Sequence, residues 1–310
     1  MQSYELIIIG AGPAGLTAGI YGVRSGLKTL VLEEKMAGGT VADAPMIGNY
    51  PGIQDAKGSE IAQKINAHAK STGVKVNEFE RVESLRLSAE RKVVKTQKAE
   101  YEAKALIIAS GSHYRELGIP GEKEFRGRGV SYCGICDGPF FKDKRVLVVG
   151  GGNSALMTAL YLAHLARETK VVHRRETFRA EEMLVQELKR LRNMEILWST
   201  EVKEIAGDKT VKKVVVLDKK SNETRDVLVD GVFVQVGESP NSQLAKEAGV
   251  AVDEDDFVKV DWLQHTNIAG VYAAGDVTNH PVKQVGTAVG QGITAALEAY
   301  GYIRRPYYKQ

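Results

Sequence analysis

The sequence has few cysteines and tryptophans, with two of each among its 310 residues, and neither sign of charge dominates it. It contains 42 Lys and Arg against 39 Asp and Glu, a formal net charge of +3, so nothing predicts binding to nucleic acid or to an anionic membrane. No apolar run reaches the roughly 18 residues that a membrane span needs. A strand-like run begins at Tyr4 and leaves no room for a signal peptide, so we expect a cytoplasmic protein.

The two cysteines, Cys133 and Cys136, form a single Cys-Gly-Ile-Cys motif. Two cysteines cannot crosslink a chain of this length, and two thiolates are only half of a structural zinc site, so we expect no metal centre. In a cytosolic α/β protein this spacing predicts a redox-active dithiol. Two inert buried thiols, or half of a metal site shared between subunits, are the alternatives.

Glycine is abundant, with 32 residues, and its first cluster follows a continuous apolar run over residues 5–9. Such a run predicts a parallel strand covered on both faces. The turn that follows contains Gly10, Gly12, Pro13, Ala14 and Gly15. Its Gly-x-Gly-x-x-Gly spacing is typical of dinucleotide binding, in which the next helix offers N–H groups to a diphosphate. Glu33 follows the next predicted strand, where an acid binds ribose hydroxyls. A glycine-rich turn without a ligand is the alternative.

The same unit recurs about 140 residues later. The apolar strand 145–149 leads into a turn with the accepted variant Gly-x-Gly-x-x-Ala, a helix predicted over 154–167, and a strand over 169–172. The turn residues are Gly150, Gly152, Asn153 and Ser154, and the position that corresponds to Glu33 holds His173, followed by Arg174, Arg175 and Arg179. Guanidinium groups bind a 2′-phosphate that a carboxylate would repel, so the second unit favours NADP. A solvated basic strand end is the alternative.

The remaining apolar runs predict the other elements of the fold. Residues 105–111 and 270–274 indicate buried strands, and 287–300 indicates a closing helix. Residues 74–103 and 213–236 alternate between apolar and polar side chains, which is typical of antiparallel strands with one face in water.

This order predicts an α/β protein with two Rossmann-like dinucleotide-binding domains, the second inserted in the first. The first domain would comprise residues 1–115 and 247–310, and the second, which carries the Cys-x-x-Cys, residues 116–246.

At this point the motifs resemble those of a known family along essentially the whole chain. They are IIIGAGPAG (7–15), GG (38–39), NYPG (49–52), GRGVSYC (127–133), CDG (136–138), VVGGGNSA (148–155), HRR (173–175), FRA (178–180) and GDV (275–277). The chain resembles the low-molecular-weight thioredoxin reductases, flavoenzymes of the pyridine nucleotide-disulfide oxidoreductase group. As in that class, the dithiol lies just ahead of the second glycine turn rather than near the N-terminus.

The resemblance implies FAD in the first domain, NADPH in the second, and a homodimer. The FAD-binding residues implied are Gly10, Gly12, Pro13, Ala14, Gly15, Glu33, Gly38, Gly39, Thr40, Asn49, Asp276, Lys283, Gln284 and Val285. The NADP-binding residues implied are Gly150, Gly152, Asn153, Ser154, His173, Arg174, Arg175 and Arg179.

The resemblance also implies a reaction. NADPH would reduce the flavin, the flavin would reduce the Cys133–Cys136 disulfide, and the dithiol would reduce thioredoxin or a thioredoxin-like protein. Asp137 would carry the proton, and Cys136 would be the sulfur on the flavin side.

The sequence departs from the family pattern where Leu156, Met157 and Thr158 replace acids near the nicotinamide position, and where Thr40 and Lys283 replace glutamine and arginine. These departures leave open an FAD dithiol oxidoreductase that takes electrons from ferredoxin or a deazaflavin, or acts on a small-molecule dithiol. A flavin-carrying sensor without turnover is a third possibility, but it would need neither the dithiol nor two complete nucleotide turns.

Overall fold

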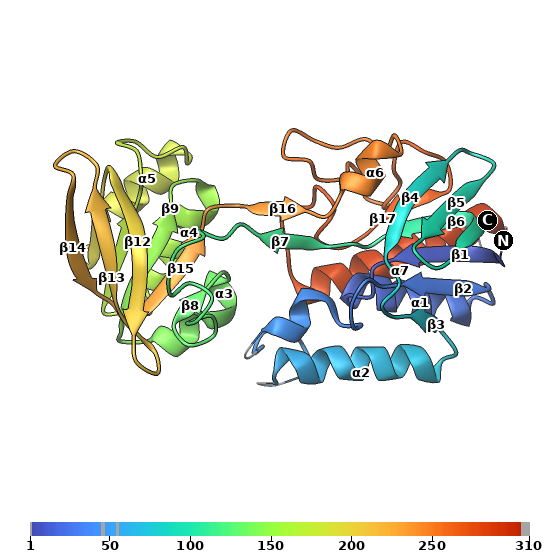
Figure 1. Ribbon diagram of the computed structural model, residues 1–310, viewed down its shortest axis with the longest axis horizontal. Coiled ribbons are helices and arrows are strands. Elements are labelled where there is room, and N and C mark those ends of the chain that lie inside the picture. The colour runs from blue at the N-terminus through green and yellow to red at the C-terminus, as the bar shows by residue number, and fades with distance from the viewer. Residues whose placement is uncertain (1, 45–46, 54–55, 305–310) are drawn as a thin grey trace. The chain divides into compact units, whose positions relative to one another are not determined.

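The computed structural model describes residues 2–44, 47–53 and 56–304. The chain divides into two compact units. The first consists of Met1–His113 with Ser239–Gln310, and the second of Tyr114–Glu238 (Figure 1). The predicted α/β architecture is confirmed: each unit is built on parallel strands with helices against them.

The first unit contains a seven-stranded sheet. Its order is β3 (Lys75–Asn77), β2 (Thr29–Leu32), β1 (Gln2–Ile9), β6 (Glu100–Ile108), β5 (Lys92–Thr96) and β4 (Val82–Leu87), and β17 (Val271–Ala273) also pairs with β6. Strands β1, β2, β3, β6 and β17 are parallel, and β4 and β5 are antiparallel additions. The helices are α1 (Pro13–Arg24), α2 (Gly58–Ser71), α6 (Gln243–Glu247) and α7 (Val285–Ile303), with a 3-10 turn, η1 (Gly39–Asp43).

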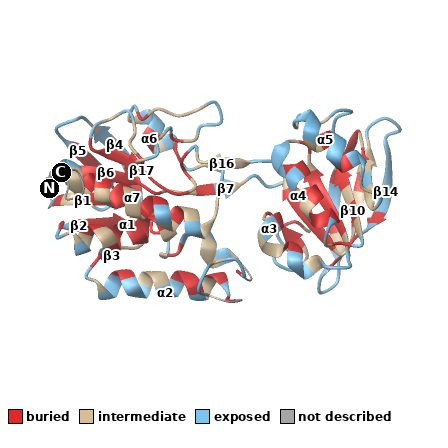
Figure 2. Ribbon diagram, turned by 180° about the vertical axis from the view of Figure 1, so that it is seen from behind, coloured by how far each residue is buried: buried red, intermediate tan, exposed pale blue. Residues whose placement is uncertain are grey.

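Strand β1 is buried on both faces, as its continuous apolar sequence predicts. Leu6 and Ile8 belong to one hydrophobic cluster, which includes alanines of α7 such as Ala295, whereas Ile7 and Ile9 belong to the cluster on the other face. Figure 2 shows the ribbon at the centre of this unit coloured as buried. The two cores hold the carboxyl end of β1, and with it the first glycine turn.

The second unit contains a five-stranded parallel sheet. Its order is β11 (Met194–Leu197), β10 (Glu168–Val172), β9 (Arg145–Gly150), β15 (Gly231–Gln235) and β8 (Val130–Ser131). A three-stranded antiparallel sheet, β12 (Thr200–Gly207), β13 (Val211–Asp218) and β14 (Glu223–Leu228), accompanies it. The helices are α3 (Gly134–Asp137), α4 (Asn153–Ala163) and α5 (Glu182–Lys189), with a 3-10 turn, η2 (Gly138–Phe141).

Two expectations need correction. The segment 231–235 is not a half-exposed antiparallel strand: β15 is buried and runs parallel to β9 at the centre of the sheet. Strand β3, within the expected antiparallel region, pairs parallel with β2. The second boundary between the two compact units lies at 238/239, and Leu244 and Ala245 of α6 pack into the core of the first unit. The segments that join the units, β7 (Ser112–Tyr114) and β16 (Glu238–Pro240), pair with each other.

Candidate redox and nucleotide-binding sites

The first glycine turn leaves no room for a side chain at Gly10 or at Gly15. Gly10 has a φ of +102°, and a Cβ there would lie 2.3 Å from the carbonyl oxygen of Ala109. A Cβ on Gly15 would lie 1.9 Å from the carbonyl oxygen of Gly10. Gly12 precedes α1, whose first residue is Pro13, and no side chain of the described residues caps this helix. The N-terminus of α1 therefore lies at a backbone turn that a phosphate can approach closely.

The carboxylate of Glu33 lies beside this turn. One of its oxygens accepts a hydrogen bond from the backbone N–H of Ala11 at 2.7 Å, and the other accepts one from the N–H of Lys35 at 2.9 Å. The paired glycines contact the same turn: the N–H of Gly38 donates to the Ala11 carbonyl at 2.8 Å. Because a Cβ on Gly39 would lie 2.9 Å from the Cα of Gly12, this second approach also requires glycine. Thr40 follows in η1.

A second group of expected flavin residues lies around the start of α7. Asn49 donates to the side-chain oxygen of Gln284 at 3.1 Å, and Gln284 is the residue before Val285, the first residue of α7. The Lys283 ammonium donates to the backbone carbonyl of Asp276 at 3.1 Å. Burial raises the pKa of the Asp276 carboxyl, and the positive charge of Lys283 opposes that rise.

Together these residues fit a flavin dinucleotide in the first unit. The glycine turn offers close backbone approach, Glu33 offers an acceptor for ribose hydroxyls, and the Asp276 carboxyl offers a further polar group.

The second glycine turn has the same construction. Gly150 has a φ of +155°, and a Cβ there would lie 2.2 Å from the carbonyl oxygen of Gln235 on the neighbouring strand β15. A Cβ on Gly151 would lie 2.2 Å from the His173 ring. Around Gly152, which precedes α4, a Cβ would meet nothing within 4 Å among the described residues. The turn is therefore closely packed on its inner side and open at the helix N-terminus.

His173 lies beneath the second glycine turn and is buried, unlike the exposed arginines that follow it in the sequence. It is only 6% exposed, and a ring nitrogen lies 3.0 Å from the Thr177 carbonyl oxygen. Burial lowers the pKa of His173, and the charges of the neighbouring arginines lower it further, against the opposing effect of the Thr177 hydrogen bond. The ring is therefore neutral at pH 7. The His173 ring packs against two aromatic rings, that of Phe178 at a centroid distance of 5.4 Å and that of Trp198 at 6.2 Å.

Arg174, Arg175 and Arg179 are exposed. Within the described ranges, none of the three forms a salt bridge with a carboxylate. The backbone N–H of Arg179 donates to the Gly151 carbonyl at 2.8 Å, so the segment that carries these guanidinium groups is bonded to the glycine turn. Asn153 and Glu181 strengthen this attachment with reciprocal hydrogen bonds of 2.9 and 2.8 Å. Ser154 is exposed in the first turn of α4.

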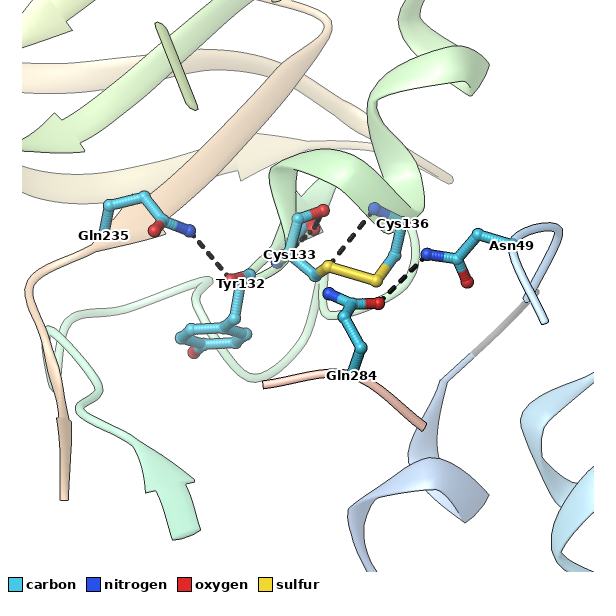
Figure 3. The surroundings of a disulfide bond; sticks show 7 residues. Asn49, Tyr132, Cys133, Cys136, Gln235 and Gln284 are labelled. Atoms are coloured by element: carbon cyan, nitrogen blue, oxygen red, sulfur yellow. Dashed lines mark hydrogen bonds between the residues drawn. A yellow bond between two sulfur atoms is a disulfide. The ribbon is translucent and has the colours of Figure 1, made fainter. Parts of the chain in front are cut away.

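Cys133 and Cys136 form a disulfide at the start of α3 (Figure 3). The backbone N–H of Cys136 donates to the sulfur of Cys133 at 3.2 Å. The Ser131 hydroxyl accepts from the N–H of Cys133 at 3.1 Å and donates to its carbonyl at 3.3 Å. Both cysteines are half-buried, and Ile135 between them is 59% exposed. The disulfide is therefore held by backbone hydrogen bonds and is only partly buried.

Asp137 follows the second cysteine and is half-buried. Burial raises the pKa of its carboxyl, and a hydrogen bond from Ser131 opposes that rise. On the other side of the motif, Thr158 of α4 packs against Gly134: a Cβ there would lie 2.6 Å from the Thr158 methyl. The departure from the family pattern at Thr158 thus lies directly beside the dithiol motif.

Sequence reasoning missed two supports of the dithiol, Ser131 and Gln235. Gln235 donates to the carbonyl of Tyr132, the residue before Cys133, at 2.8 Å (Figure 3). It ends strand β15, next to β9 in the sheet. The signal was available, since polar residues at the carboxyl ends of neighbouring parallel strands meet at one edge, but it required assigning 231–235 as a central parallel strand.

Similar proteins decide the family. The sequence profile of the pyridine nucleotide-disulphide oxidoreductases matches residues 4–292. The chain is 40% identical over 302 residues to a 34.2 kDa protein of a rubredoxin operon in Clostridium pasteurianum, covering 97% of this chain and 98% of that one. It is 38% identical over 301 residues to a thioredoxin reductase of Bacillus subtilis, covering 97% and 95%. The crystal structure of thioredoxin reductase from Streptococcus pyogenes matches with a TM-score of 0.92 and 38% identity, covering 97% and 98%.

The chain belongs to the pyridine nucleotide-disulphide oxidoreductase family. The resemblance to the low-molecular-weight thioredoxin reductases is confirmed, and with it the expectation of a disulfide reductase that uses FAD and NADP. The described part of the chain contains no helix long and apolar enough to span a membrane. In that part we also find no group of three or more His, Cys, Asp or Glu side chains arranged to hold a metal ion.

Proposed function

We propose that this enzyme uses NADPH to reduce the disulfide of thioredoxin or a thioredoxin-like protein, through FAD and the Cys133–Cys136 couple. One observation carries the proposal: a partly exposed disulfide lies in the same unit as a nucleotide turn bordered by three arginines that have no carboxylate partner among the described residues. The overall reaction consumes one NADPH and one proton, and converts one protein disulfide into two thiols.

In this proposal the first unit binds FAD through the glycine turn, Glu33 and the residues around the start of α7. When bound, FAD supplies the redox chemistry that links hydride transfer from the nicotinamide to reduction of the disulfide. In the second unit, the open N-terminus of α4 receives the diphosphate of NADPH, and Arg174 and Arg175 bind its 2′-phosphate. His173, neutral and buried, supports the turn and carries no charge to the phosphate.

The dithiol would act through two inequivalent sulfurs. The N–H of Cys136 already donates to the Cys133 sulfur, so after reduction it can stabilise a thiolate there. Cys133 would then attack the partner's disulfide, and Cys136 would resolve the mixed disulfide. Asp137, whose pKa is raised by burial, can hold the proton that these exchanges move at its carboxyl oxygen.

We also propose that the protein acts as a homodimer in the cytoplasm. The support is the family alone, and sedimentation at several concentrations would test the dimer.

The experiment compares the rates of thioredoxin reduction with NADPH, NADH and reduced ferredoxin as donors. We expect NADPH to be used at least tenfold better than NADH, because only NADPH offers a phosphate to the arginines. Cys133→Ser should abolish thioredoxin reduction while leaving flavin reduction by NADPH intact. Efficient turnover with ferredoxin and none with NADPH would contradict the proposed donor. Undiminished turnover in Cys133→Ser would contradict the role of the dithiol.

A further inference from the structure

Tyr132, the residue before Cys133, is held at both its side chain and its backbone. It is 7% exposed, and its hydroxyl donates to a carboxylate oxygen of Glu122 at 2.9 Å. Its carbonyl accepts from the side chain of Gln235 at 2.8 Å. Glu122, Tyr132 and Gln235 are here called the Tyr132 clamp.

Glu122 is itself firmly placed. It is 1% exposed, and its two carboxylate oxygens accept from the backbone N–H groups of Leu117 at 2.9 Å and Gly118 at 2.8 Å. These residues follow strand β7, which joins the units. Burial and the adjacent Glu122 carboxylate raise the pKa of the Tyr132 phenol above its usual range, so the hydroxyl remains a donor at any physiological pH.

The aromatic ring of Tyr132 adds a second attachment to the same segment. It stacks on Tyr114, the last residue of β7, with a centroid distance of 5.3 Å and an interplanar angle of 17°. The guanidinium of Arg126 lies 5.3 Å from the ring centroid. Gln235 attaches the backbone to the nucleotide side, since its own carbonyl lies against Gly150 of the second glycine turn.

We propose that Tyr132 is a positioning residue of the redox dithiol, which fixes the backbone that enters Cys133 and so favours the disulfide over the dithiol. The inference rests on the proposed redox role of the two cysteines. Its physical basis is the freedom of the reduced state: once the S–S bond is broken, only the surrounding contacts hold the two sulfurs close. A backbone that cannot move keeps their effective concentration high, whereas a looser backbone lowers it.

The test measures the thiol–disulfide equilibrium of the FAD-loaded enzyme in dithiothreitol buffers of varied oxidation state. The disulfide and reduced dithiothreitol exchange two electrons and two protons to give the dithiol and oxidised dithiothreitol. The reaction is quenched with acid, and free thiols are alkylated and counted by mass spectrometry. Thioredoxin takes no part, so an enzyme that fails to reduce thioredoxin can still pass or fail this test.

Tyr132→Phe removes the hydroxyl but keeps the stacked ring. We expect its disulfide to be about threefold to tenfold easier to reduce than that of the wild type, the scale of the net contribution of one ordinary hydrogen bond. Gln235→Met, which removes the donor to the Tyr132 carbonyl, should shift the equilibrium in the same direction.

The first unit offers a matched control in Tyr101. Its hydroxyl donates to Glu80 at 2.7 Å, and the two residues are 3% and 4% exposed. Tyr101→Phe therefore removes the same kind of bond from a different unit and should leave the dithiol equilibrium within twofold of the wild type. The proposal is overturned if Tyr132→Phe stays within twofold of the wild type, if it makes the disulfide harder to reduce, or if Tyr101→Phe shifts the equilibrium equally.

Discussion

The arginines beside the second glycine turn give the clearest quantitative prediction. Replacing Arg174 and Arg175 together by glutamine should weaken the binding of NADPH and leave the binding of NADH nearly unchanged. Both guanidinium groups are exposed and have no carboxylate partner among the described residues, so no existing ion pair has to be broken when they bind a phosphate. The neutral, buried His173 cannot take over their charge.

A hydrogen bond between charged groups contributes about 1.5–3 kcal/mol. Taking the lower value for each of two exposed arginines gives about 3 kcal/mol, or roughly a hundredfold in Kd. Stopped-flow reduction of the flavin, followed over a range of NADPH or NADH concentrations, measures both affinities in the same enzyme.

A matched control is Arg190→Gln with Arg192→Gln, which removes the same charge from exposed positions of the same unit. We expect this control to change NADPH binding by less than about threefold, the screened effect of distant charges. The reasoning would be refuted if the Arg174 and Arg175 variant lost NADPH and NADH affinity equally. It would also be refuted if the control lost as much NADPH affinity.

Three further outcomes are expected. Gly151→Ala should raise the KM for NADPH at least tenfold, because its Cβ would lie 2.2 Å from the His173 ring, and steady-state kinetics would check this. Arg145 lowers the pKa of Asp230 to about 2, so this pair should stabilise the fold by about 1–2 kcal/mol at neutral pH and lose that contribution as the pH falls from about 4 to 2. Urea unfolding of Asp230→Asn and of the wild type should therefore show a smaller difference in the free energy of unfolding at pH 3 than at pH 7. Because burial raises the pKa of Asp137, the fold loses stability as the pH rises through the ordinary titration range of a carboxyl group, so Asp137→Asn should unfold at a higher temperature than the wild type at pH 7. The same variant should reduce thioredoxin about a hundredfold or more slowly, and wild-type activity would exclude Asp137 as the proton carrier.

Local spacing was sufficient to predict the two nucleotide turns. A strand must end, a glycine must allow the backbone to turn, and a helix must begin, all within about ten residues, so sequence neighbours decide the geometry. Gly10 and Gly150 have the positive φ values that this turn requires, and Glu33 lies at the turn as expected. The position of the Cys-x-x-Cys motif ahead of the second turn could be predicted from the sequence in the same way.

The burial of strands and their long-range pairing could not be predicted from local spacing in the same way. The run Val232-Phe233-Val234 suits a half-exposed strand as well as a buried one, and only the flanking strands β8 and β9 place it in the core. The boundary at Ser239 depends on where the short helix α6 packs, which no local pattern specifies.

The dithiol supports show the same limit. Glu122 and Gln235 are far apart in the sequence, and they meet around Tyr132 only because the carboxyl end of β15 lies beside the segment that enters Cys133. A buried glutamate in a polar segment gives no sign in the sequence of which hydroxyl it will bind.

The most direct test of the central claim is an anaerobic titration with NADPH that follows the flavin absorbance. If the electrons pass from NADPH through the flavin to the Cys133–Cys136 disulfide, the wild type should need about two equivalents of NADPH for complete reduction, one for the flavin and one for the disulfide. A variant with both cysteines replaced by serine should need about one. Equal consumption by the two proteins would contradict the account, because the disulfide would then receive no electrons from the flavin.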